Sequence, residues 1–234
     1  MTIIQKQWKL ILGVFGVILL VGAGIMIRTV MATTKEQKAQ EKFFMIEKKY
    51  TDYKEKKNAP PPDLKNTKAA PATTPEALAL ELTEVKGQLE KFVTENPVSK
   101  ATQMAALYFS EILKEEKNKE LALSTLQKVQ TQDTGLVNTL VQQQIGQLLA
   151  DSNKCQDAID IWQKIVARKE ASFLHNEVKI QQALCYQQLN NSQKAEELLT
   201  NIANQKPDGQ INSTTTKDAA KYLRLLQMKK VSGI

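Results

Sequence analysis

The apolar residues of this chain recur mostly at helical spacing, and one uninterrupted apolar run stands apart from the rest. Residues 10–27 (LILGVFGVILLVGAGIMI) contain no charged side chain. A helix of this length is about the minimum that crosses a bilayer, and it satisfies its backbone amides internally. Trp8 lies at one end of the run and Arg28 at the other. The pattern predicts a transmembrane helix at residues 10–28, preceded by a short tail at 1–9.

The basic residues around this run leave its orientation open. Lys6 and Lys9 precede it, but further lysines follow it, so the positive-inside count is ambiguous. A terminal anchor followed by a long domain usually exports that domain. We therefore expect a cytoplasmic N-terminus and an exported C-terminal domain, and favour a retained anchor over a signal peptide cleaved near Ala32.

Residues 34–57 are rich in Lys and Glu and carry a narrow apolar seam. The seam residues are spaced four, three, four and three positions apart: Ala39, Phe43, Ile46, Tyr50 and Tyr53. This spacing places them on one face of a charged juxtamembrane helix. Such a seam is compatible with a solvated stalk, with a strip that binds a partner, or with one arm of a helical hairpin.

A proline-rich segment separates this helix from the rest of the chain. Residues 58–74 show no apolar periodicity, and their three consecutive prolines favour an extended tether. Thr74 and Pro75 then supply a cap and a first helical position. Apolar residues at four-three spacing continue to Phe92, and Pro97 ends the helix.

Three later segments share one plan: an amphipathic helix, a short polar turn, and a second helix with an alanine near its start. Aligning these alanines gives a period of about 36 to 37 residues, close to the roughly 34 of tetratricopeptide repeats. A small residue is expected there because the two helices of a hairpin approach most closely at that point. Small residues also recur twelve positions before each alanine, and large ones four positions after it. The three sets are Ala122, Ala158 and Ala195; Ser110, Gly146 and Ala183; and Leu126, Trp162 and Leu199.

The predicted fold class is therefore all-α. One N-terminal transmembrane helix is followed, at residues 75–230, by a tetratricopeptide-like right-handed α-solenoid of about three helical hairpins. Such repeats bury their apolar faces only by stacking, so the array needs capping helices. The helix from Pro75 and the helix at 217–228 are the expected caps.

Composition and candidate chemistry argue against catalysis. The net charge is +7, but lysines alternate with glutamates, which is typical of solvated helix faces and not of a nucleic-acid surface. No phosphate-binding glycine loop, nucleophile elbow or paired-carboxylate arrangement occurs. The lone His175 has no neighbours spaced to complete a metal site. We expect no enzyme activity, no cofactor and no metal.

The two cysteines can be placed relative to each other. Cys155 lies sixteen residues before a turn near Ala171, and Cys185 lies fourteen residues after it. The helices that carry them should run antiparallel, so the two side chains could sit at one level and form a disulfide. Two buried free thiols are the alternative.

The repeat register also predicts a protein-binding surface. First helices line the concave side of such solenoids. This polar groove is expected to bind segments of other proteins weakly and adaptably, unless its residues are merely solvated. The inward positions are Leu107, Glu111, Gln143, Gln147, Ile180 and Gln187.

The order of these elements, with a last helix ending in YLRLLQMKK, resembles the tetratricopeptide-like ancillary subunit family of the bacterial Sec translocon. That resemblance implies a single-pass protein of the bacterial inner membrane with a cytoplasmic N-terminus and a periplasmic C-terminal domain. It implies translocon subunits, chaperones or exported chains as partners. Two functions stay open: a membrane-anchored interaction module with a chaperone-like or adaptor role near the translocon, or a structural scaffold of the cell envelope, in cell division or a secretion apparatus, assembling through the helical seams. The oligomeric state is open as well.

Overall fold

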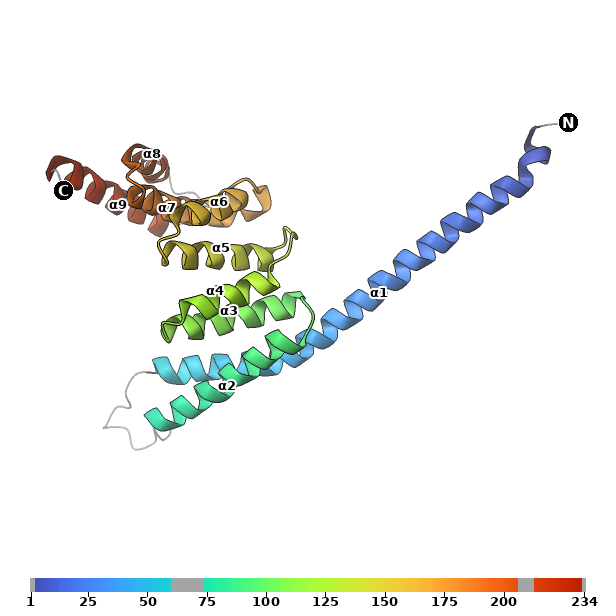
Figure 1. Ribbon diagram of the computed structural model, residues 1–234, viewed down its shortest axis with the longest axis horizontal. Coiled ribbons are helices and arrows are strands. Elements are labelled where there is room, and N and C mark those ends of the chain that lie inside the picture. The colour runs from blue at the N-terminus through green and yellow to red at the C-terminus, as the bar shows by residue number, and fades with distance from the viewer. Residues whose placement is uncertain (1–2, 60–73, 206–212, 233–234) are drawn as a thin grey trace.

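The computed structural model describes residues 3–59, 74–205 and 213–232. Within these ranges the chain folds into nine α-helices and one short 3-10 helix, without a strand. Most of the helices lie side by side in a stack, while the N-terminal part of the first helix projects away from it (Figure 1). In chain order the elements are α1 Ile3–Asn58, α2 Pro75–Glu95, α3 Lys100–Glu115, α4 Lys119–Val129, α5 Leu136–Ala150, α6 Cys155–Val166, η1 Lys169–Ala171, α7 Ser172–Gln188, α8 Ser192–Ala203 and α9 Ser213–Ser232.

The described helices pair in sequence order into four hairpins. α1 packs with α2, α3 with α4, α5 with α6, and α7 with α8. α9 ends the stack by packing against α8 and α7. Each hairpin also contacts the next one, so the apolar sides of the helices are buried by stacking.

The turns inside three of the hairpins have the same local structure. Lys117, Asn153 and Asn190 each adopt a positive φ, of 63°, 59° and 59°. The residue after each of them donates its backbone N–H to a carbonyl five residues earlier, at 2.8, 2.9 and 2.8 Å. This is the Schellman arrangement that ends a helix. Asn118 and Asn191 then cap the next helix with their side-chain oxygens, so the same polar turn stops one helix and starts another.

Small residues lie where the two helices of a hairpin approach each other. Ala122, Ala158 and Ala195 are all 0% exposed. At Gly146 the approach is closer still, because a Cβ added there would lie 2.3 Å from Nε1 of the buried Trp162. The Trp162 side chain of α6 therefore leaves no room for a methyl group at position 146.

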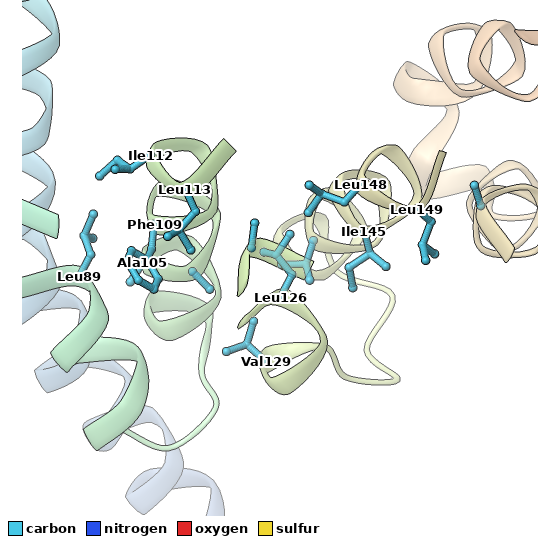
Figure 2. Close-up of a cluster of buried hydrophobic side chains, with 14 of the residues drawn as sticks. Leu89, Ala105, Phe109, Ile112, Leu113, Leu126, Val129, Ile145, Leu148 and Leu149 are labelled. Atoms are coloured by element: carbon cyan, nitrogen blue, oxygen red, sulfur yellow. The ribbon is translucent and has the colours of Figure 1, made fainter. Parts of the chain in front are cut away.

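One apolar core runs from the second half of α1 to α7. Figure 2 shows its middle part, where Leu89, Phe109, Leu126 and Ile145 come from four successive helices, α2 to α5. A second, smaller core joins α7 to α8 and α9. Burial of apolar surface on this scale is the main favourable term in folding. The second core consists of Ile180, Ala183, Ala195, Leu199, Ile202, Ala219 and Leu226.

The prediction of a transmembrane helix at residues 10–28 is wrong. In the part of the chain that the structure describes, no helix has the length and apolar character needed to cross a membrane. The apolar run is instead continuous with the charged segment that follows it, since α1 extends without a break from Ile3 to Asn58. The predicted inner-membrane location, with a cytoplasmic N-terminus and a periplasmic domain, depended on that helix and is corrected with it.

The charged segment at residues 34–57 is neither a separate helix nor a stalk. Its seam faces α2 and α3, and Phe43, Tyr50 and Tyr53 are only 5%, 4% and 6% exposed. Lys49 of α1 binds Glu84 of α2 at 2.7 Å. Of the three interpretations of this seam, the structure shows the arm of a hairpin, which adds one hairpin to the three expected from the repeats.

The start and end of α2 follow from local chemistry. The Thr74 side chain accepts a hydrogen bond from the Ala77 N–H at 3.2 Å, and Pro75 occupies the first helical turn. α2 ends at Glu95, two residues before Pro97. The tether proposed for residues 58–74 lies, from 60 to 73, outside the described residues.

Candidate functional site

The first helices of the four hairpins lie next to one another along one side of the stack, which we call the first-helix face. α1 contacts α3, α3 contacts α5, and α5 contacts α7. Polar side chains bridge two of these junctions. Lys54 of α1 binds Glu111 of α3 at 2.8 Å, and the Gln143 amide of α5 donates to the Glu177 carboxylate of α7 at 2.8 Å. Exposed pairs of this kind contribute about 0 to 1 kcal/mol each, so they align the helices more than they stabilise them.

An aromatic cluster holds α1 against α3. The ring centroids of Phe43 and Tyr108 are 5.8 Å apart, and those of Tyr50 and Tyr108 are 5.1 Å apart. Phe92 of α2 lies 5.8 Å from Phe43, so three helices meet at this cluster. Tilted or offset aromatic pairs at such distances add about 0.5–1.5 kcal/mol to the gain from burial.

A carboxylate from α1 caps the N-terminus of α3. The Glu36 oxygens accept hydrogen bonds from the backbone N–H groups of Lys100 at 3.3 Å and Ala101 at 3.2 Å. These N–H groups have no partner inside their own helix, and the positive end of the helix dipole favours an anion there. Glu36 thus fixes the point at which α1 leaves the stack.

Two tyrosines of the cluster are held in their neutral form. Burial, reinforced by the Glu47 carboxylate that accepts the Tyr108 hydroxyl at 2.9 Å, raises the pKa of Tyr108 to about 12. Burial also raises the pKa of Tyr50, and the Glu111 carboxylate acts in the same direction. A phenolate at either position would be poorly solvated and would face negative charge.

We therefore expect the fold to lose stability at alkaline pH. An unfolded tyrosine ionises near pH 10, whereas Tyr108 in the fold has a pKa of about 12. The unfolded chain then binds fewer protons than the folded chain, so the stabilising contribution is complete below pH 10 and is lost as the pH rises through about 12. Titration of phenolate absorbance should show late-ionising tyrosines, and one of them should be missing in Tyr108→Phe. If the group that Tyr108→Phe removes ionises near pH 10 instead, the proposed burial of this hydroxyl is wrong.

A hollow opens on the first-helix face between α1 and the start of α3. Its volume is about 530 Å³. Phe44, one of its lining residues, is 59% exposed. The carboxylates of Glu41 and Glu47 lie beside the apolar side chains of the hollow. The hollow, called the α1–α3 hollow below, is lined by Gln40, Glu41, Phe43, Phe44, Glu47, Ala101 and Met104.

The six residues predicted for the binding surface lie in different environments in the structure. Glu111 and Gln143 lie on the first-helix face in the bridging pairs described above. The Gln147 amide donates to the carboxylate of Asp151, the C-cap residue of its own helix, at 2.9 Å. Leu107 and Gln187 are half-buried. Ile180 is only 5% exposed and belongs to the second core, so its predicted place on the surface is wrong.

The sequence did not predict the α1–α3 hollow. Most of its lining comes from α1, whose place beside α3 depends on a contact between segments about 60 residues apart in the chain. One signal was present: Phe44 follows the seam residue Phe43 directly, so two adjacent phenylalanines cannot both face the same side of a helix.

The two cysteines form a disulfide. Cys155 Sγ and Cys185 Sγ are 2.23 Å apart, and the bond joins α6 to α7. Both residues are buried, at 2% and 1% exposure. His175 lies at the start of α7, far along the helix from Cys185, and its Nε2 is 2.8 Å from the backbone oxygen of Arg168. Among the described residues no three potential metal-ligating side chains cluster around it or elsewhere.

A scan against protein-family models and searches of curated proteins and of solved structures found no match to this chain. The tetratricopeptide, Sec translocon and chaperone assignments therefore find no support and are corrected. The reason lies in the evidence on which they depended: the spacing of small residues and the order of segments can arise wherever helical hairpins stack.

Proposed function

We propose that this protein is a protein-binding module that holds a segment of a partner protein in the α1–α3 hollow. The observation that carries the proposal is the exposure of Phe44 in a hollow that the half-buried Met104 also lines. Aromatic and methionine side chains are enriched at protein interfaces, and buried aromatic residues act there as anchors. The neighbouring carboxylates of Glu41 and Glu47 favour a partner with basic residues around its apolar anchor.

The alternative of a scaffold that assembles through its helical seams has less support. The seam of α1 is buried against α2 and α3, and that of α2 is buried in the same core, with Val85 and Leu89 2% and 0% exposed. Neither seam is free to join copies of the chain. The proposal therefore places binding on the first-helix face.

Selection of displayed random peptides on the full-length protein tests this function. We expect enrichment of peptides with one aromatic or aliphatic residue flanked by Lys or Arg. Phe44→Asp should weaken the binding of a selected peptide at least about tenfold, as loss of an anchor does. Phe173→Asp is the matched control, because Phe173 is 58% exposed but lies on α7. Peptides that bind both variants equally, or that show no basic bias, would contradict the proposal.

A further inference from the structure

The last helix, α9, has no second helix of its own in the described part of the chain. α1, α3, α5 and α7 are each followed by a helix that packs against them and completes a hairpin. α9 packs against α8 and α7 as another first helix would, and continues to Ser232 without a successor among the described residues. Figure 1 places it at the opposite end of the stack from α1 and α2. One side of α9 is therefore uncovered.

The register of small residues also identifies α9 as a first helix. Ser110, Gly146 and Ala183 mark the crossing points in α3, α5 and α7, at intervals of 36 and 37 residues, and Ala220 follows after another 37. Ser110, Gly146 and Ala183 are buried, whereas Ala220 is half-buried. Ala220 thus occupies the position where a second helix would cross, and no helix of the described chain crosses it there.

A hollow of about 380 Å³ lies at this position. Lys217, Lys221 and Arg224 line it at four-three spacing, which places the three cations on one side of the helix. None of the three forms an ion pair within the described residues. Leu225 completes the lining beside Ala220 and is 48% exposed. The surface offers two apolar side chains, Ala220 and Leu225, bordered by positive charge.

The first hairpin shows which side chains on a second helix pair with lysines on a first helix. There Lys49 and Lys56 of the first helix bind Glu84 and Glu81 of the second helix, at 2.7 and 2.6 Å. A second copy of α9 would bring its own cations and be repelled, whereas a helix with carboxylates would pair with them. We propose that α9 binds an acidic amphipathic helix of a partner protein along the side that no described helix covers.

A peptide with the sequence of residues 75–95 is a suitable probe. It is the second helix of the first hairpin, carries an apolar seam, and contains five glutamates and two lysines. Fluorescence anisotropy of the labelled peptide with the full-length protein should show saturable binding. The double variant Lys221→Glu/Arg224→Glu should weaken it at least about tenfold. Ala220→Trp should weaken it as well, by filling the crossing point.

Three controls test whether the peptide binds at α9 and at no other surface of the protein. Lys164→Glu, an exposed lysine on α6, should leave the affinity unchanged. Lys49→Glu/Lys56→Glu should also leave it unchanged; a loss there would mean that the peptide replaces α2, and would overturn the proposal. Absence of saturable binding, or binding insensitive to the α9 variants, would overturn it too. The third control is sedimentation: a dimer that Lys221→Glu/Arg224→Glu dissociates would also overturn it, since a second copy would then be the occupant.

Discussion

Gly146→Ala should lower the free energy of unfolding by about 3 kcal/mol, although it adds only one methyl group. The new Cβ would lie 2.3 Å from Nε1 and 2.6 Å from Cε2 of Trp162, and this side chain is 1% exposed and enclosed by the core. Overpacking of this kind typically costs about 1–3 kcal/mol. Moving the indole would also break the hydrogen bond from Trp162 Nε1 to the Gln143 carbonyl, now at 3.3 Å, and leave a buried donor unpaired.

Gly87→Ala is the matched control for this prediction. Gly87 is also a helical glycine, in α2, but a Cβ added there would meet nothing within 4 Å. Alanine stabilises an unstrained helix interior by about 0.5–1 kcal/mol relative to glycine, so this variant should gain stability. Urea denaturation of both variants measures the contrast. Adding Trp162→Phe to Gly146→Ala should recover part of the loss, and equal effects at the two glycines would show that the Trp162 indole does not lie so close to position 146.

The hairpins could be read from the sequence because their determinants are local. A polar turn with an asparagine or lysine at positive φ ends one helix and caps the next, as at Asn190 and Asn191. Small residues at a fixed interval mark where two backbones meet, as at Gly146 and Ala158. Such features act within one repeat, so they do not depend on how distant segments are arranged.

The packing of α1 against α2 and α3 could not be predicted from such local features. The seam at Phe43, Tyr50 and Tyr53 is compatible with several packing partners. That it packs against α2 and α3 is decided by tertiary contacts between segments far apart in the chain. Hydrophobicity alone also gave the wrong interpretation of the apolar run, which suggested a membrane helix that the described residues do not contain.

The candidate site was only partly predictable for the same reason. Register placed Glu111 and Gln143 on the first-helix face, where the structure finds them bridging neighbouring helices. Ile180 has the same register as Gln143, but α8 and α9 bury it in the second core. Predicting the α1–α3 hollow would have required knowing where α1 packs. Predicting the open side of α9 would have required knowing which helices cover it. Surfaces formed by the ends of a repeat array differ from those that its internal repeats predict.

Removing the disulfide should have the second large effect on stability. Cys155 and Cys185 are 30 residues apart in the chain, and the loop-closure model assigns about 3.5 kcal/mol to a cross-link of that span. Because both sulfur atoms are buried, reduction should be slow under native conditions and rapid in denaturant. Urea denaturation with and without reductant measures the difference, and Cys155→Ala/Cys185→Ala should be insensitive to the reductant.

The stability lost when the disulfide is reduced should not be uniform along the stack. The disulfide ties α6, in the larger core, to α7, which also carries Ile180 and Ala183 of the second core. Stability in stacked hairpins depends on neighbouring interfaces, so the C-terminal hairpin is the part that loses its covalent support. Hydrogen exchange should therefore accelerate more in α7 and α8 than in α3 and α4 when the bond is reduced. Equal acceleration in both hairpins would mean that the two cores unfold as one unit and that the bond does not join separable parts.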